Sequence, residues 1–273
     1  MAARDSGDDP AGTAAEFSSF LLLDHREAWS ATAAEDAVGA LAPETASAVR
    51  TRPGLRAFAI RSVHPRRADA QATYLGNTGP AGVLTTTAEP LSIAELVALD
   101  GPRRGPTDLL FAVCTNGKRD RCCAIVGRGV AVGLHEHHGE QVVEISHLGG
   151  HRYAGTMLVL PWAYAYGFLD LAGASAVVEA AQRGLVHPVG LRGRADLPPV
   201  AQAADVLLRR ELGPAAPDAV RIRSVTDDDG TAVVDAEVEG RTVLIRLRRQ
   251  TGPVVTQTQC GPKPFATGQW VTA

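Results

Sequence analysis

The stretch that most restricts the fold of this chain lies in its middle, at residues 108–147. DLLFAVC, residues 108–114, is a nearly continuous apolar run of the kind that a strand covered on both faces requires. AIVGRGVAVGLHEHH, residues 124–138, keeps a helical period despite its glycines, and QVVEISH, residues 141–147, is a second strand candidate. These segments predict a strand, a helix and a strand, with both strands ending at the same edge of a sheet.

Further strands and helices are expected on both sides of this unit. Before it, strands are predicted at 17–23, 55–63 and 71–76, and helices at 35–50 and 91–100. After it, a strand is predicted at 156–162, a strand or turn at 163–170, and helices at 175–184 and 200–212. The first helix is interrupted near Pro43, and Ser92 with Glu95 has the pattern of a capping box. The mixture predicts an α/β fold class.

The C-terminal part has a different pattern, and the chain is expected to divide into four parts. Residues 219–250 predict three antiparallel strands, because Asp229-Gly230 and Glu239-Gly240 stand where hairpin turns belong, while the tail from 257 is expected to be irregular. GPRRGPTD, residues 101–108, is the best domain boundary. The expected parts are a disordered leader (1–16), an N-terminal α/β segment (17–105), a central domain (106–195) and a C-terminal helix with a β-meander (196–273).

Composition narrows the function classes. The 273 residues are 45% hydrophobic, which is enough for a sizeable core. A net charge of -3 and a pI near 6.2 give no reason to expect a nucleic acid or an anionic membrane as the main partner. The chain has no run of roughly 18 apolar residues and no signal peptide pattern, so we expect a cytoplasmic protein. In that compartment cysteines tend to be reduced, metal-bound or catalytic.

The main candidate site combines thiols with imidazoles. Cys114 ends the first strand of the central unit, and Cys122 and Cys123 open its helix. His147 ends the second strand, and His151 follows it in HLGGH, where paired glycines favour a tight loop. Sulfur and imidazole ligands suit tetrahedral zinc or a [2Fe-2S] cluster. The spacing matches neither the zinc-finger nor the Rieske pattern, so it leaves the choice between these groups open.

Other polar residues are weighed against simpler roles. Lys118, Arg119 and Arg121 give the cysteine loop a positive rim that could steer an acidic redox partner. The histidines of HEHH, residues 135–138, are expected to complement the helix dipole rather than bind metal. Trp162 and Trp270 are expected to be packing residues, and Cys260 is expected to be a packing residue or a free thiol.

FAVCTNGKRDRCCAIVG together with SHLGGHRYAGTMLVLP resembles the sucrase/ferredoxin-like family, in its branch of thioredoxin-like [2Fe-2S] ferredoxins. The resemblance spans about 108–190, and FLLLDHREAW and CGPKPFATGQW match more loosely. It implies a thioredoxin-like fold for the central domain. It also implies a [2Fe-2S] cluster on two cysteines nine positions apart and on the histidines of H-x-G-G-H. The ligands implied here are Cys114, Cys123, His147 and His151, with Cys122 as the alternative for the second thiolate.

The expected function is that of an electron-transfer protein. The alternatives are a thiol oxidoreductase that uses Cys122 or Cys123, and a binding module stabilised by zinc; the lack of a C-x-x-C pair counts against the first of these. A glycosidase needs two carboxylates that face one another across a sugar site. The two motifs supply only Asp120 and, just before the second motif, Glu144, so sucrase activity is not expected.

Overall fold

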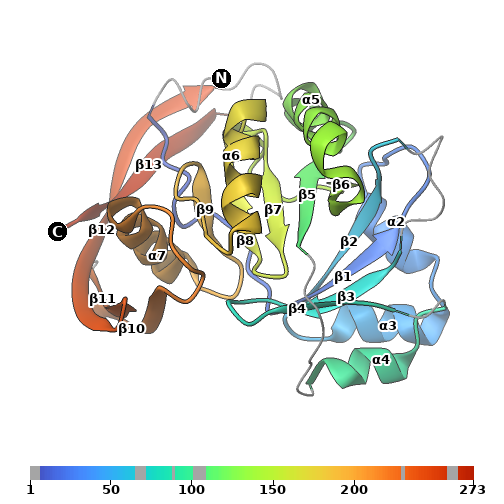
Figure 1. Ribbon diagram of the computed structural model, residues 1–273, viewed down its shortest axis with the longest axis horizontal. Helices are drawn as coiled ribbons and strands as arrows, with labels where there is room; N and C mark the ends of the chain where they lie inside the picture. The colour runs from blue at the N-terminus through green and yellow to red at the C-terminus, as the bar shows by residue number, and fades with distance from the viewer. Residues whose placement is uncertain (1–6, 65–71, 88–89, 101–108, 229–230, 257–263) are drawn as a thin grey trace.

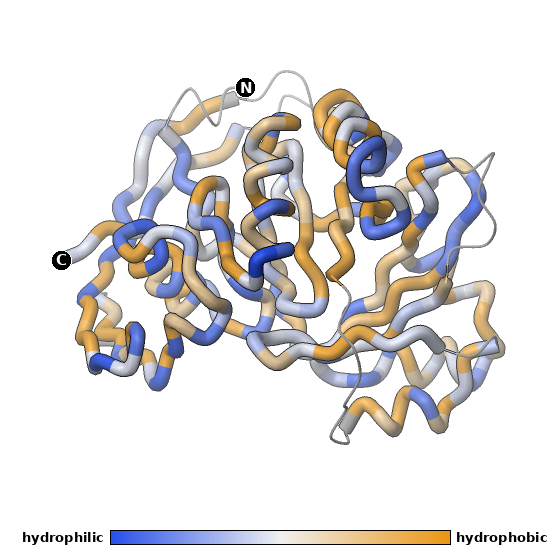
Figure 2. The backbone as a smooth tube through the Cα atoms, viewed as in Figure 1, coloured by the Kyte–Doolittle hydropathy of each residue, from blue (hydrophilic) through white to orange (hydrophobic). Residues whose placement is uncertain are grey.

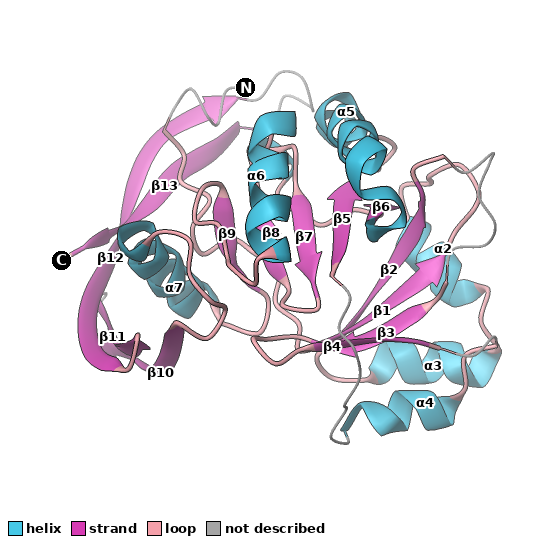
Figure 3. Cartoon of the chain, viewed as in Figure 1, coloured by secondary structure: helices cyan, strands magenta, loops and turns pink. Residues whose placement is uncertain are grey.

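The computed structural model describes residues 7–64, 72–87, 90–100, 109–228, 231–256 and 264–273. Two sheets organise these residues, one with nine strands and one with four (Figure 1). Helices cover the large sheet, and the small sheet curves around one end of the molecule (Figure 3). The α/β class predicted from the sequence is confirmed. Among the described residues no helix combines the length and the apolar character needed to cross a membrane.

The N-terminal part of the large sheet contains four strands and three helices. In chain order they are β1 (Ser19–Asp24), α2 (Ala33–Gly39), α3 (Pro43–Thr51), β2 (Leu55–Ser62), β3 (Tyr74–Asn77), β4 (Val83–Thr86) and α4 (Ile93–Val97). β1 and β2 are parallel, β3 is antiparallel to β1, and β4 is antiparallel to β3. The predicted break near Pro43 is confirmed, because this proline occupies the first turn of α3, where its missing N–H costs little. The capping box of Ser92 and Glu95 is also present.

The central part repeats the same sequence of pairings. Its elements are β5 (Leu110–Cys114), α5 (Arg121–His138), β6 (Val142–Ile145), β7 (Met157–Leu160), β8 (Tyr164–Tyr166) and α6 (Leu171–Gln182). β5 and β6 are parallel, β7 is antiparallel to β5, and β8 is antiparallel to β7. The predicted strand, helix and strand are therefore confirmed, although α5 begins three residues earlier than expected.

The two parts share one topology. If the strands of each part are numbered along the chain, their spatial order is fourth, third, first, second in both, which is the strand order of the thioredoxin-like fold. The parts join where β2 and β6 pair antiparallel, with Ile60 opposite Ile145. The full order is β4-β3-β1-β2-β6-β5-β7-β8-β9, with β9 (Leu191–Arg194) at the far edge. The thioredoxin-like prediction is confirmed for the central part, and the N-terminal half has the same design.

The core follows the strands of the large sheet. Every residue of β5 and β6 is buried, as the apolar run at 108–114 predicted for the former. Apolar residues, orange in Figure 2, are concentrated along the central strands of the large sheet. Phe20, Phe58 and Phe111 are almost completely buried, and burying a side chain of this size contributes roughly 1.5–3 kcal/mol.

The N-terminal segment differs from the disordered leader expected for 1–16. Of this segment the structure describes residues 7–16, and Asp8, Ala11 and Ala14 are buried. The backbone N–H of Gly12 donates to the carbonyl oxygen of Arg192 on β9, at 2.8 Å. Small side chains permit this packing, because a Cβ at Gly12 would lie 2.7 Å from the carbonyl oxygen of Pro199.

The C-terminal extension consists of one helix and an antiparallel sheet. It comprises α7 (Pro199–Leu212), β10 (Val220–Asp228), β11 (Thr231–Val238), β12 (Arg241–Thr256) and β13 (Pro264–Thr272). The three expected strands are confirmed, and Glu239 and Gly240 have the positive φ of a hairpin turn. The expectation of an irregular tail was wrong for 264–272, because β12 is long enough to offer β13 a complete pairing edge.

The structure differs from the sequence-based predictions in a few further elements. The strands β4 and β9 were not predicted, since each has only four residues and little alternation. Short 3-10 turns complete the described chain, at Ala98–Asp100, Gly139–Gln141 and His151–Tyr153. The predicted boundary at 101–108, the turn Asp229-Gly230 and Cys260 lie outside the described residues.

Candidate metal centre

Two neighbouring parallel strands bring the halves of the site together. Cys114, the last residue of β5, lies opposite Ile145, the last residue of β6, and His147 follows two residues later. The backbone N–H of Thr115 donates to the carbonyl oxygen of Ile145 at 3.3 Å, so the two chains remain adjacent beyond the strand ends. The expectation that both strands end at one edge of the sheet is confirmed.

The start of α5 supplies the second thiol. The loop after β5 turns tightly, since the N–H of Asp120 donates to the carbonyl oxygen of Asn116 at 3.1 Å. Helix α5 then crosses directly over the end of β5. A glycine is required at this crossing, because a Cβ at Gly127 would overlap the carbonyl oxygen of Cys114. This close approach places Cys123, in the first turn of α5, beside Cys114.

The ligand atoms form two overlapping groups. The sulfurs of Cys114 and Cys123 and a ring nitrogen of His147 lie within 4.8 Å of one another, and Cys123 Sγ is 3.8 Å from His147 Nδ1. A second group, also within 4.8 Å, joins His147 to Asp120 and His151. Both cysteines are buried, while both histidines are partly accessible. These residues could hold a metal ion, and His147 belongs to both groups.

His151 is oriented by a carboxylate. Its Nδ1 lies 2.8 Å from Oδ2 of Asp120, the residue that precedes α5. Burial raises the pKa of Asp120, although the neighbouring imidazoles of His151 and His147 oppose the shift. A carboxylate on one ring nitrogen leaves the other nitrogen as the ligand atom, which is the usual outer-shell arrangement of a metal-binding histidine.

The paired glycines make the tight loop that their sequence predicts. Gly149 and Gly150 have φ values of 79° and 70°, which non-glycine residues rarely adopt. Gly150 also needs its lack of a side chain, because a Cβ there would lie 2.5 Å from Nη2 of Arg192. The loop therefore brings His151 back toward Asp120 while lying directly on a buried guanidinium.

Arg192 borders the candidate site, and sequence reasoning missed it. Its guanidinium is 2% exposed and donates to the carbonyl oxygen of Gly149 at 3.0 Å, to Thr13 Oγ1 at 3.2 Å and to the carbonyl oxygen of Thr13. Within the described residues no carboxylate lies at ion-pair distance from it. Burial lowers its pKa to about 10, and the charges of Tyr153, Cys114 and Cys123 work in the opposite direction. LRGR carries no pattern that distinguishes this arginine from a surface residue.

The two free thiols of the site differ in pKa. A hydrogen bond from the Cys123 thiol lowers the pKa of Cys114 well below its ordinary value in spite of burial. His147 and the backbone N–H of Leu148 add further hydrogen bonds to Cys114 in the same direction. The pKa of Cys123 is raised by its hydrogen bond to Cys114 and by burial. Cys114 is therefore the thiol poised to be a thiolate, which is the form that binds metals.

The other predicted residues fall into separate roles. Cys122 is buried and disulfide-bonded, so it is not one of the two free thiols of the site. Exposed side chains form the predicted positive rim of Lys118, Arg119 and Arg121. The histidines of HEHH lie in the last turn of α5, and Trp162 and Trp270 pack against core clusters, as expected. Glu144 is fully buried between Arg61 and Arg128, which gives it a structural role.

The comparisons with known proteins agree with the motifs. No curated protein matches the chain, and no solved structure matches it. The family model described as sucrase/ferredoxin-like matches residues 10–193, which is more than half of the chain. The matched region contains both thioredoxin-like halves and every residue of the two ligand groups. The chain therefore belongs to the sucrase/ferredoxin-like family.

Proposed function

We propose that this chain is an electron-transfer protein that holds a [2Fe-2S] cluster with Cys114, Cys123, His147 and His151. The observation that carries the proposal is the convergence of two buried free thiols and two imidazoles at one end of β5 and β6. When bound, the cluster supplies one-electron redox chemistry.

The donor set fits such a cluster. Two thiolates and two imidazoles are the ligand types of Rieske centres. Cys114 is already biased toward the thiolate, and Asp120 holds the proton on Nδ1 of His151, so that its Nε2 remains the ligand atom. Burial of both thiols limits the access of water and of exchanging thiols.

Charge favours an electron acceptor at this site. Two thiolates and two neutral imidazoles would bring an oxidised core of charge about +2 close to neutrality, whereas four thiolates would leave about −2. Adding an electron then costs less electrostatic energy. Arg192 adds a buried positive charge beside the thiols. We therefore expect a potential above that of plant-type ferredoxins.

Zinc is the second candidate, and it rests on a different observation. Three ligand atoms already lie within 4.8 Å of one another, a spacing that a single tetrahedral ion can satisfy. Asp120 or His151 is close enough to His147 to complete such a set. A thiol oxidoreductase has less support, because Cys123 is 1% exposed and Cys122 is disulfide-bonded.

The proposed partner is an acidic redox protein. Lys118, Arg119 and Arg121 are exposed on the loop and helix start that carry the cysteines. Such a rim would attract a negative partner surface over a range that salt shortens. The rate of electron transfer should therefore fall as ionic strength rises. A rate that does not change with salt would exclude this docking mode.

The central test is metal analysis of anaerobically purified protein. We expect about two irons and two sulfides per chain, with a red-brown colour. Cys114→Ser and His151→Ala should lose them, while the exposed His137→Ala on α5 should retain them. Stoichiometric zinc in a colourless protein would support the second candidate. Protein that takes up neither metal would contradict both.

A further inference from the structure

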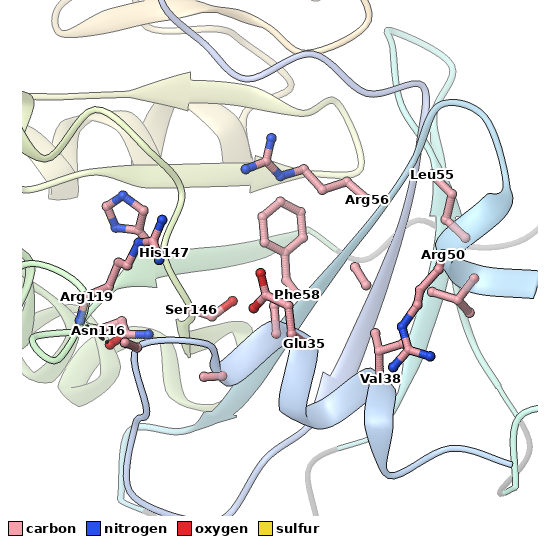
Figure 4. Close-up of a pocket in the computed structure, with 15 residues that line it drawn as sticks. Glu35, Val38, Arg50, Leu55, Arg56, Phe58, Asn116, Arg119, Ser146 and His147 are labelled. Carbon is pink, nitrogen blue, oxygen red and sulfur yellow. Dashed lines mark hydrogen bonds between the residues drawn. The ribbon is translucent and has the colours of Figure 1, made fainter. Parts of the chain in front are cut away.

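A cleft of about 360 Å³ opens beside His147, where the two thioredoxin-like halves meet (Figure 4). Its position follows from the antiparallel pairing of β2 and β6, which sets Ile60 opposite Ile145 at the end of β6, so that the start of β2 extends past the end of β6. Ser146, just after β6, continues this contact, since its N–H donates to the carbonyl oxygen of Ala59 at 2.8 Å. The volume falls within the usual range of small-molecule sites.

Each half of the molecule supplies one wall of the cleft. His147 and Arg119 come from the metal-centre side and lie together at one end in Figure 4. Helices α2 and α3 and strand β2 supply the opposite wall, which carries Glu35, Arg50 and Arg56. The N-terminal half thus takes part in a site that neither half forms alone.

The charges of this cleft are unbalanced. Three guanidiniums line it, those of Arg50, Arg56 and Arg119, against the single carboxylate of Glu35. In the described part of the chain, no carboxylate lies within ion-pair distance of any of these three arginines. Arg56 is partly buried, and its guanidinium lies 5.4 Å from the centre of the Phe58 ring. A partly buried guanidinium in a cleft whose lining has a net positive charge favours the binding of an anion.

Most of the remaining lining residues are apolar, and Asn116 and Ser146 are polar. Leu55 and Ala57 are partly accessible on this wall, and the nearly buried side chains of Phe58, Val38 and Val49 lie behind them. A bare inorganic ion would leave these surfaces in contact with water, whereas a ligand with an apolar body would cover them. Guanidiniums pair well with carboxylates through two parallel hydrogen bonds.

We propose that this cleft binds a small organic carboxylate, with its charged group at the guanidinium of Arg56 and its apolar body against Leu55 and Ala57. Such a ligand would lie against the imidazole of His147, which also belongs to the metal centre. The arginines and the apolar wall belong to the chain itself, so the binding does not depend on which metal the centre holds.

Benzoate is a suitable probe for the full-length protein as purified. Saturation-transfer NMR, titrated with benzoate, should give a dissociation constant on the order of 1 mM, a normal affinity for so small a ligand. Benzamide has the same shape without the charge and should bind about tenfold more weakly. Inorganic phosphate has the charge without the apolar body and should also bind more weakly than benzoate.

Substitutions that should change the affinity for benzoate in opposite directions distinguish an effect on ligand recognition from an effect on folding. Arg56→Gln should weaken benzoate binding about tenfold, whereas Glu35→Gln, which removes the one opposing carboxylate, should strengthen it about threefold. Ala34→Phe should block the cleft without changing its charge. Arg246→Gln, an exposed arginine on β12 of the other sheet, is the matched control and should change nothing.

Three outcomes would overturn the proposal. Benzamide binding as tightly as benzoate would show that the charge of the ligand plays no part, and phosphate binding as tightly as benzoate would show that the apolar wall plays none. The third outcome is that Glu35→Gln and Arg119→Gln, tested as separate variants, each bind benzoate with the affinity of the wild type. That result would exclude a role for the charges of the cleft in binding. Both of these last side chains are exposed, so the two variants should fold even if Arg56→Gln does not.

Discussion

Arg192 places a buried positive charge beside the thiols of the candidate metal centre, from a position 78 residues beyond Cys114 in the chain. A buried guanidinium is costly unless nearby negative charge compensates for it. Here the compensation comes from carbonyl oxygens and from the thiols, with no carboxylate of the described residues at ion-pair distance. The same strand offers a contrast in Arg194, which is also buried but lies 2.5 Å from Asp196.

Arg192→Gln should therefore lower the reduction potential of the loaded centre. Loss of the positive charge should shift the midpoint by on the order of 60 mV, the change that corresponds to a tenfold equilibrium effect for one electron. Redox titration measures it, and Arg192→Lys should restore part of the shift. Arg194→Gln should reduce stability without moving the potential. Equal midpoints for both glutamine variants would refute an electrostatic role for Arg192.

Gly150 lies directly against the guanidinium of Arg192, and this contact explains why a glycine is needed there. Gly150→Ala should lower the free energy of unfolding by more than the cost of a left-handed alanine, which is about 1–2 kcal/mol, because its Cβ also meets Arg192. Urea denaturation of the purified protein measures this loss. Gly184→Ala is the control, with a φ of 78° and open space around it, and should show the backbone cost alone. Similar losses for the two variants would mean that the loop does not press on Arg192.

At the scale of elements, the site depends on how closely α5 lies on β5. The glycines of α5 differ in their surroundings: Gly127 faces the carbonyl oxygen of Cys114, whereas Gly129 has nothing within 4 Å of its would-be Cβ. A glycine in a helix costs stability unless close packing requires it. Substitution of Gly129 therefore tests helix propensity alone, whereas substitution of Gly127 also tests the packing of α5 on β5.

Gly127→Ala should move α5 away from β5 and separate Cys123 from Cys114. We expect lower metal content per chain and a lower free energy of unfolding. Gly129→Ala, in the same helix, should instead raise the stability by roughly 0.5–1 kcal/mol and leave the metal content unchanged. Metal analysis of both variants measures the metal content per chain, and urea denaturation measures the free energy of unfolding. An unchanged metal content in Gly127→Ala would show that the crossing does not position Cys123.

At the scale of the whole molecule, one buried carboxylate connects the two thioredoxin-like halves. Glu144 on β6 pairs with Arg61 on β2 of the N-terminal half and with Arg128 on α5. Arg61 in turn lies 4.2 Å from the centre of the Trp29 ring. The junction between the halves is thus charged, with its carboxylate fully buried, and it lies beside the candidate metal centre.

Glu144→Gln should destabilise the whole chain, because it leaves two cationic groups at the junction without their carboxylate. Removing one partner of a buried ion pair typically costs about 3–5 kcal/mol, and partial exposure of Arg128 places this case near the lower end. Chemical denaturation should show it as an earlier midpoint. Glu140→Gln, an exposed neighbour on the same chain segment, should have no measurable effect. Equal midpoints for the two variants would exclude a stabilising junction.

Local sequence patterns predicted much of the architecture. Three examples are the apolar run DLLFAVC, the helical period of 124–138 and the capping box at Ser92. Each pattern reflects hydrogen bonding and burial within its own segment, so the corresponding elements are confirmed. The tail was misjudged because β13 is stabilised by pairing with β12, an interaction that local pattern does not record. The same is true of β9, whose residues pair with β8.

The sequence by itself determined the α/β class, the strand, helix and strand unit, and the thiols and imidazoles at its ends, because these depend on residues close together in the chain. Only the tertiary structure decided that Arg192 lies behind Cys114, that both halves have the same strand order, and that Arg56 faces His147 across one cleft. These contacts join residues far apart in the chain. They exist only after the strands have paired, so no local pattern encodes them.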